Sequence, residues 1–124
     1  MPAVLLVGLG GAAGAMARYG LGLALPVRDG FPAATLLINF LGSFLIGILA
    51  GLAERSRLSE SLSLLLKTGL CGGFTTFSTF SLEAADLFRS GRWPQGSVYA
   101  VLSLGLCLAG VVLGRMAIRV LIRA

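Results

Sequence analysis

Apolar residues fall in four long runs separated by short polar connectors, and each run approaches the roughly 20 helical residues that are needed to cross a bilayer. Within their apolar centres only two charged residues occur, Arg18 in the first run and Lys67 in the third. The pattern therefore predicts an all-α membrane protein. We expect one membrane domain over residues 1–124, with four transmembrane helices at about residues 3–27, 31–53, 60–88 and 96–119.

The third run differs from the others because its midpoint, residues 72–80, reads Gly-Gly-Phe-Thr-Thr-Phe-Ser-Thr-Phe. A straight membrane helix satisfies its own main chain, so paired glycines and four hydroxyl residues are not needed merely to span. Broken helices recur in mid-membrane where an ion is held, because half-helix ends and unwound carbonyls face the ion. We predict a helix that begins with Ser61 as its cap, runs to about Gly72, breaks, and resumes near Thr76.

Two other runs carry polar residues at every fourth position, on one face of a helix: Thr35, Asn39 and Ser43 in the second run, and Tyr99, Ser103 and Cys107 in the fourth. Such a face either holds helices together through hydrogen bonds or lines a wet path. Asn39 is the most informative of these residues, because a side-chain amide in hydrocarbon must find partners. Its NH₂ group is suited either to interhelical contact or to donation to an anion.

Phe77 and Phe80 lie three residues apart and should share one face of the resumed helix. Packing is the ordinary role of such a pair, but the electropositive edges of the rings can also support an anion. Farther along, Glu83 and Asp86 are expected to face the lipid headgroups, and Trp93 fits the aromatic belt at the membrane interface.

Small and basic residues bear on how the helices assemble and insert. Glycines four residues apart, which allow close helix packing, occur in every run, at 10/14, 47/51, 69/73 and 110/114. With both termini on one side, that side has six Lys and Arg residues and the other has four, including Arg28. So weak a bias permits insertion in both orientations, and a fixed orientation with cytoplasmic termini is the alternative. Arg18 either anchors its span at the headgroups or makes a vestibule positive.

Composition agrees with a membrane protein, since 56% of residues are hydrophobic, 12% are charged and none is histidine. The net charge is +5, and lipid headgroups explain the arginines that flank the spans, which argues against nucleic acid. We find no metal-ligand cluster, no nucleophile–base set and no phosphate loop, so the chain is not expected to be an enzyme. No acidic residue is placed deep in a span, which disfavours cation-coupled antiport. Neutral donors, ring edges and a basic rim instead favour passive passage of a small anion.

These residues resemble the Fluc (CrcB) family of fluoride channels. The resemblance covers essentially the whole chain in length, number of spans and order of motifs, and the fourth span matches only loosely. The matching segments are Gly10–Gly11 with Gly14–Tyr19 in the first span, Thr35–Leu36 with Asn39, Gly42–Phe44 and Gly47 in the second, and the highly specific Gly72–Ser81 in the third.

The resemblance implies four-helix subunits that pair antiparallel as a dual-topology homodimer in the cell membrane, with two fluoride pores along the interface. It also implies one central structural Na⁺, not transported, held by the main-chain carbonyls of Gly72 and Thr75 from both subunits. Asn39 would donate to fluoride, and Arg18 would lend positive potential to the vestibule. The remaining pore residues implied in this way are the aromatic pair Phe77 and Phe80 and the hydroxyl residues Thr35, Ser78, Thr79, Tyr99 and Ser103. Cys107 would end the polar track with a weak thiol donor.

The function so implied is passive exit of fluoride from a bacterial-type cell, which lowers its cytoplasmic concentration. One alternative is a small multidrug-resistance-type antiporter, which has a similar length and number of spans but needs an acidic residue in the middle of its first span. The other is a non-transporting membrane assembly subunit held by glycine contacts. That hypothesis leaves the combination of Asn39, Phe77 and Phe80 unexplained.

Overall fold

The computed structural model describes residues 1–26 and 29–123, and every regular element in these ranges is a helix, as predicted. The predicted end of the first span at Val27 and the basic residue Arg28 lie outside the described residues. Three helices are long and apolar enough to cross a membrane: α1 (Ala3–Ala24), α2 (Ala33–Glu54) and α6 (Trp93–Arg123). The predicted span at 60–88 consists of four consecutive pieces, α3 (Glu60–Leu62), η1 (Ser63–Cys71), α4 (Gly72–Phe74) and α5 (Phe77–Arg89).

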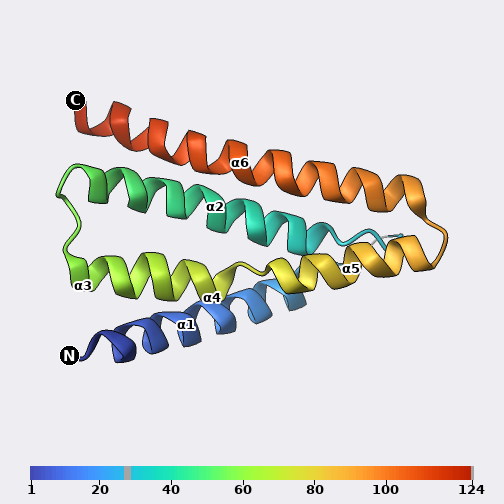
Figure 1. The fold of residues 1–124 in the computed structure, drawn as a ribbon, viewed down its shortest axis with the longest axis horizontal. Coiled ribbons are helices and arrows are strands. Elements are labelled where there is room, and N and C mark those ends of the chain that lie inside the picture. Colours follow the sequence, from blue (N-terminus) through green and yellow to red (C-terminus); the bar gives the residue numbers. More distant parts are fainter. Residues whose placement is uncertain (27–28, 124) are drawn as a thin grey trace.

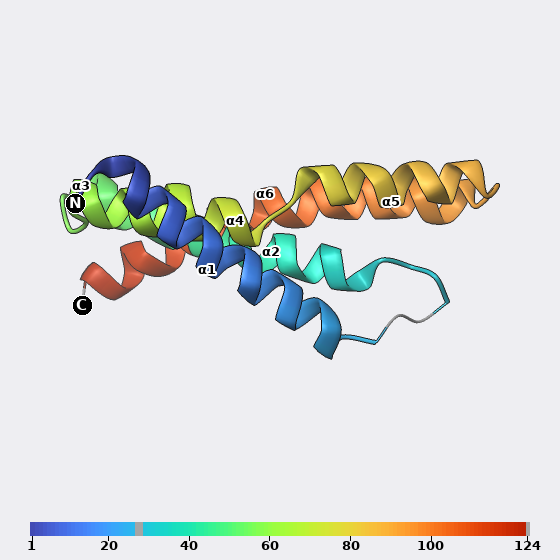
Figure 2. The ribbon, with the colours of Figure 1, turned by 90° about the horizontal axis from the view of Figure 1, so that it is seen from below.

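Figure 1 shows α2, α6 and the series from α3 to α5 lying alongside one another, with both chain ends at the end where α2 connects to α3. The connection from α5 to α6 lies at the opposite end. Seen from below, α1 runs obliquely across the first half of this series and diverges from α5, which lies beside α6 (Figure 2). The second half of the third span therefore packs on α6, and the first half packs on α1.

The predicted glycine pairs lie at two helix crossings. Gly10 and Gly14 of α1 face the 69/73 pair of η1 and α4, while Gly47 of α2 lies against Val111 and Gly114 of α6. A Cβ atom added at Gly14 would overlap the main-chain carbonyl of Leu70, and one added at Gly114 would overlap that of Phe44. At both crossings the main chains touch directly, which is the close approach that glycine permits.

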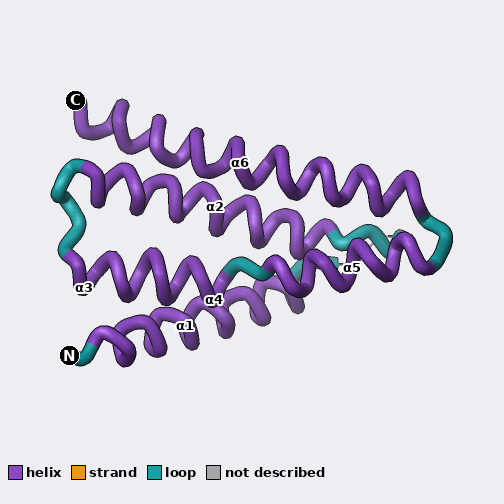
Figure 3. Tube along the Cα trace, in the orientation of Figure 1, coloured by secondary structure: helices purple, strands orange, loops and turns teal. Residues whose placement is uncertain are grey.

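The third span breaks at two threonines, which separate α4 from α5 (Figure 3). Thr75 (φ −86°, ψ 157°) and Thr76 (φ −151°, ψ 112°) are both extended, whereas Gly72 remains helical (φ −62°, ψ −40°). The helix thus continues a little beyond the predicted end at Gly72 and resumes at Phe77. The reason is that Gly73 serves the contact with α1, where a Cβ atom would overlap the Gly11 carbonyl, rather than the unwinding.

Predicted boundaries of the third and fourth spans need correction, and the last helix also ends at Arg123, four residues beyond the predicted end at 119. The third span is capped by Ser59, whose hydroxyl accepts a hydrogen bond from the Leu62 N–H at 3.2 Å, and not by Ser61. The last helix begins at Trp93, three residues before the predicted start, because Pro94 is compatible with the first turn of a helix.

Candidate functional site

Asn39 of α2 forms hydrogen bonds with the main chain at the break in the third span. Its Oδ1 accepts a hydrogen bond from the Thr76 N–H at 2.8 Å, and its Nδ2 donates to the Thr76 carbonyl at 3.1 Å. The side-chain amide therefore pairs with both main-chain groups of one residue, as a neighbouring strand would. Because Nδ2 carries two hydrogens, one N–H remains after the bond to Thr76.

The first turn of α5 is capped by the Thr76 side chain. The Thr76 hydroxyl accepts from the Thr79 N–H at 3.1 Å and donates to the Thr79 hydroxyl at 3.0 Å, and the Ser78 hydroxyl lies 3.3 Å away. Two predicted pore residues, Ser78 and Thr79, thus gather around a helix cap and do not line the cavity described below.

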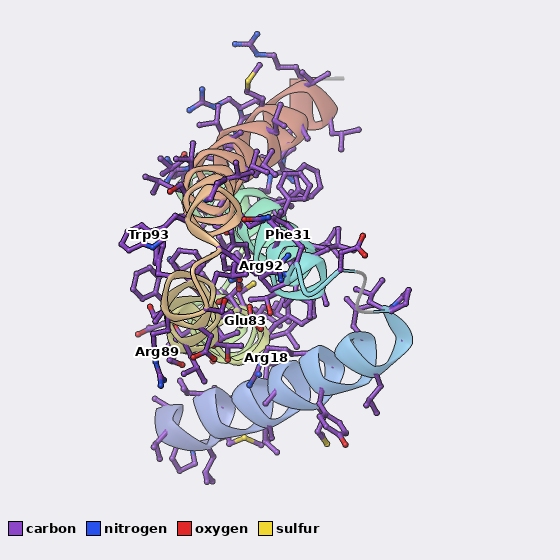
Figure 4. The ribbon with its side chains drawn as sticks, turned by 90° about the vertical axis from the view of Figure 1, so that its right-hand side faces the viewer. Arg18, Phe31, Glu83, Arg89, Arg92 and Trp93 are labelled. Atoms are coloured by element: carbon purple, nitrogen blue, oxygen red, sulfur yellow. The ribbon has the colours of Figure 1, made fainter. Side chains whose placement is uncertain are left out.

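The break leaves carbonyl groups without their helical partners. In a continuous helix the Thr76 N–H would bond the Gly72 carbonyl and the Thr79 N–H would bond the Thr75 carbonyl, but these donors turn to Asn39 and to the Thr76 hydroxyl. At Gly73 the missing partner is replaced, because Arg18 Nε donates to its carbonyl at 3.3 Å. Figure 4 shows Arg18 extending from α1 toward the third span. Gly72 and Thr75 therefore offer carbonyl oxygens, the hard ligands that suit an alkali cation.

A cavity of about 610 Å³ lies against this break, between α2, the third span and α6. It brings together Asn39, Gly72, Thr75, Phe77, Phe80 and Ser103 of the predicted set. The other lining residues are Gly42, Ser43, Ile46, Lys67, Cys71, Thr76, Ala100, Leu104 and Cys107. Among the described residues that line it there are amide, hydroxyl and thiol groups and one ammonium group, but no carboxylate.

The two phenylalanines lie at one part of this lining, as their spacing predicted. The ring centroids of Phe77 and Phe80 are 5.4 Å apart, with the planes tilted by 47°. Phe80 also packs on Tyr99, at a centroid distance of 5.1 Å, while the Phe77 side of the pair is open, since that residue is 79% exposed. One ring is thus fixed from behind, and the other projects from the surface of the single chain.

Glu83 was expected to face the headgroups, and this prediction is wrong. Its carboxylate is half-buried and accepts hydrogen bonds from the Thr35 hydroxyl at 2.8 Å and from the Tyr99 hydroxyl at 2.7 Å. Figure 4 shows Glu83 between the helices, whereas Arg89 and Trp93 lie toward the outside. The hydroxyls of Thr35 and Tyr99, which were predicted to line the pore, therefore donate hydrogen bonds to a carboxylate that was not among the predicted site residues.

A sequence signal for Glu83 exists. It continues, at a spacing of three, the series that starts with Phe77 and Phe80, and it is followed by the buried residues Ala84 and Leu87. Phe80, Glu83, Ala84 and Leu87 therefore share the inward face of α5 beside Tyr99, whereas Phe77 at the start of the series is exposed.

Ser103 differs from Thr35 and Tyr99, whose hydroxyls have a hydrogen-bond partner. Its Oγ atom is buried, the residue is 7% exposed, and among the described residues it has no hydrogen-bond partner. A buried hydroxyl without a partner costs free energy, so its position against the cavity needs an explanation. An anion or a water molecule in the cavity would provide an acceptor.

Comparison with known proteins gives the family. The family model of "CrcB-like protein, Camphor Resistance (CrcB)" matches residues 5–115. Two relatives called fluoride-specific ion channel FluC are each 51% identical to this chain. The protein of Ruminiclostridium cellulolyticum covers 91% of this chain and 89% of its own length, and that of Chlorobaculum tepidum covers 88% of each.

A third relative of the same name, from Rhizobium leguminosarum bv. trifolii, is 47% identical over 94% of this chain and 96% of its own length. The resemblance inferred from the motifs is thereby confirmed over nearly the full chain. The chain belongs to the CrcB-like family.

Proposed function

We propose that this protein is a fluoride-selective channel of the cell membrane, through which the anion leaves the cell passively. The observation that carries the proposal is the lining of the cavity. It combines amide and hydroxyl donors and two phenyl rings, and no carboxylate lines it among the described residues. Its near-full-length relatives are called fluoride-specific ion channels, and the long apolar helices agree with a multi-pass membrane protein. The chain is accordingly a transporter and not an enzyme.

The chemistry of the lining suits a small anion. Fluoride is tightly hydrated, so a path through hydrocarbon must offer hydrogen-bond donors in place of water. Among the described residues, the second N–H of Asn39 and the Ser103 hydroxyl are donors without a partner. The edges of Phe77 and Phe80 add weak positive potential without a fixed charge that would trap the ion.

Roles differ for the remaining predicted residues. Thr35 and Tyr99 act through Glu83, whose position they fix, and Ser78 and Thr79 act through the Thr76 cap. Arg18 lies against the Gly73 carbonyl, so its positive charge is held near the break and contributes potential there. These contacts support a pore in which fewer side chains donate to the anion than the sequence suggested.

We further propose that all four predicted spans cross the membrane and that two chains pair antiparallel. The single chain leaves Phe77 exposed beside an open cavity, which a second copy would close. An antiparallel pair needs insertion in both orientations, which the weak asymmetry of the basic residues allows. Each pore would then lie between the two chains.

A structural Na⁺ fits the main-chain carbonyls of Gly72 and Thr75. The N–H groups that would bond these two carbonyls in a continuous helix bond side chains instead, whereas at the Gly73 carbonyl Arg18 replaces the missing N–H. When bound, the ion would supply positive charge to these oxygens at the interface of the two chains. Replacement of sodium by N-methyl-D-glucamine during purification should then weaken the dimer in size-exclusion chromatography. An unchanged dimer would contradict this part of the proposal.

Export is tested in cells that lack their own fluoride exporter. Expression of this chain should restore growth on fluoride-containing medium and lower the fluoride content of the cells. Equal growth with and without the chain, at verified expression in the membrane, would contradict the proposed export. The antiporter hypothesis receives no support from the relatives, and α1 carries no acidic residue.

A further inference from the structure

Lys67 is the one charged residue in the lining of the cavity, among the residues that the structure describes. It lies in the middle of η1 and is half-buried. It takes no part in the helix crossings or in the contacts at the break, although a charged side chain within a membrane span is costly and commonly marks an ion pathway.

The ammonium of Lys67 has no charge partner within the described part of the chain. Of the five acidic residues, Glu54 pairs with Arg115 at 3.1 Å, Glu83 binds two hydroxyls and Asp86 lies 3.9 Å from Arg89, while Asp29 and Glu60 form no ion pair within the described ranges. None of these carboxylates lines the cavity. The cavity therefore contains one positive charge without a balancing carboxylate, which favours an anion over a cation.

The position of Lys67 along the span defines which end of the cavity it serves. Lys67 lies eight residues after the Ser59 cap, within η1, which is a π-helix. The segment between α3 and α4, which contains η1, lies in the half of the molecule where the two chain ends are (Figure 1). Phe77 and Phe80 line the cavity on the far side of the break.

A second observation points to a ligand in the same cavity. The buried Ser103 hydroxyl lines it without any partner among the described residues, and Ser43 and Cys107 add a hydroxyl and a thiol to the lining. A positive charge at one end and unpaired donors beyond it form the sequence of groups that would attract an anion and then replace part of its water.

We propose that Lys67 attracts the anion at the cavity end nearer the chain termini and thereby sets its rate of entry. The inference rests on the proposed function, since it assigns a step of fluoride passage to one residue. Its alternative is a lysine that extends its ammonium to the lipid headgroups and serves only as an anchor.

The test compares initial rates of fluoride efflux from zwitterionic liposomes for the wild type, Lys67→Gln and Lys67→Arg. An impermeant salt sets the ionic strength to about 0.01 M or about 1 M, where the Debye length is roughly 30 Å or 3 Å. Arg57→Gln removes one charge from an exposed residue on the same side of the chain and serves as the matched control.

We expect Lys67→Gln to be about tenfold slower than the wild type at low ionic strength, because a field of one sign in a cleft raises entry rates by that order. The difference should shrink at high ionic strength. Lys67→Arg and Arg57→Gln should stay close to the wild type. If Lys67→Gln does not assemble, Lys67→Met takes its place.

Three results would overturn the inference: a Lys67→Gln rate and salt response equal to the wild type, an Arg variant as slow as the Gln variant, or a wild-type rate that does not depend on salt. Failure of the proposed function is distinct from these, because it would appear as a wild type that passes no fluoride at either ionic strength.

Discussion

Asn39 and Thr76 are joined by two hydrogen bonds, from the Thr76 N–H to Oδ1 at 2.8 Å and from Nδ2 to the Thr76 carbonyl at 3.1 Å. One side chain on α2 thus pairs with both main-chain groups of Thr76, and its Oδ1 replaces the partner that the Thr76 N–H loses where the third span is broken. The sequence left two roles open for Asn39, interhelical contact or donation to an anion. The geometry allows both at once, since one N–H of the amide remains after the contact is made.

Asn39→Ala should therefore lose fluoride efflux and stability together. We expect the free energy of unfolding to fall by about 1–3 kcal/mol, because the Thr76 N–H would be left unpaired and the bond to the Thr76 carbonyl would be lost. Thermal unfolding in detergent measures this loss. Ser43→Ala is the control, one helical turn along α2 in the same cavity lining, and it should unfold like the wild type. An Asn39→Ala protein of wild-type stability would show that the two bonds do not hold the break.

Glu83 and Tyr99 should be energetically coupled through the 2.7 Å hydrogen bond between the Tyr99 hydroxyl and the carboxylate. We predict a coupling free energy of about 1–3 kcal/mol in a double-mutant cycle of Glu83→Gln and Tyr99→Phe, since bonds to a charged group lie in that range. Thermal or denaturant unfolding of the four proteins gives the value. Strictly additive effects would mean that Glu83 does not hold Tyr99 in the folded protein.

Ser103→Ala should separate function from stability. Removing a buried hydroxyl without a partner relieves a cost, so stability should stay the same or rise by about 1 kcal/mol, while fluoride efflux falls. Cys107→Ala is the matched change one turn along α6 and should alter efflux less, because a thiol is a weak donor. A Ser103→Ala protein with wild-type efflux would remove Ser103 from the anion path.

Gly14→Ala tests the crossing of α1 with η1 and α4. Its Cβ atom would overlap the Leu70 carbonyl, so we expect a loss of about 1–3 kcal/mol, the usual cost of overpacking. Gly8→Ala on the same helix is the control, because nothing lies within 4 Å of its added Cβ atom. There alanine should be neutral or stabilising by up to about 1 kcal/mol. Equal unfolding temperatures for the two variants would contradict the close approach of these helices.

The helical fold and the break in the third span were predictable because both follow from local patterns. Long apolar runs specify membrane helices, and the paired glycines with four hydroxyl residues at 72–80 mark a segment that a plain span does not need. The position of the break was less predictable. Whether Gly73 unwinds or packs depends on α1, whose Gly11 lies far away in the sequence.

Contacts between distant residues explain the other differences. Glu83 meets Thr35, 48 residues away, and Tyr99, 16 residues away, and no local pattern states that pairing. Arg18 was assigned to a headgroup anchor or a vestibule, whereas it reaches the Gly73 carbonyl 55 residues away. Both side chains form hydrogen bonds with groups that come within reach only after the helices have packed.

Fluoride and chloride efflux from liposomes that contain the purified wild-type protein tests the central claim most directly. The membrane potential is set by K⁺ and valinomycin, and ion-selective electrodes follow the two anions in parallel with empty liposomes. The account predicts rapid loss of fluoride while chloride is retained, because the cavity offers neutral donors for a small anion. Fluoride efflux no faster than from empty liposomes, from protein shown to be folded and dimeric, would contradict it.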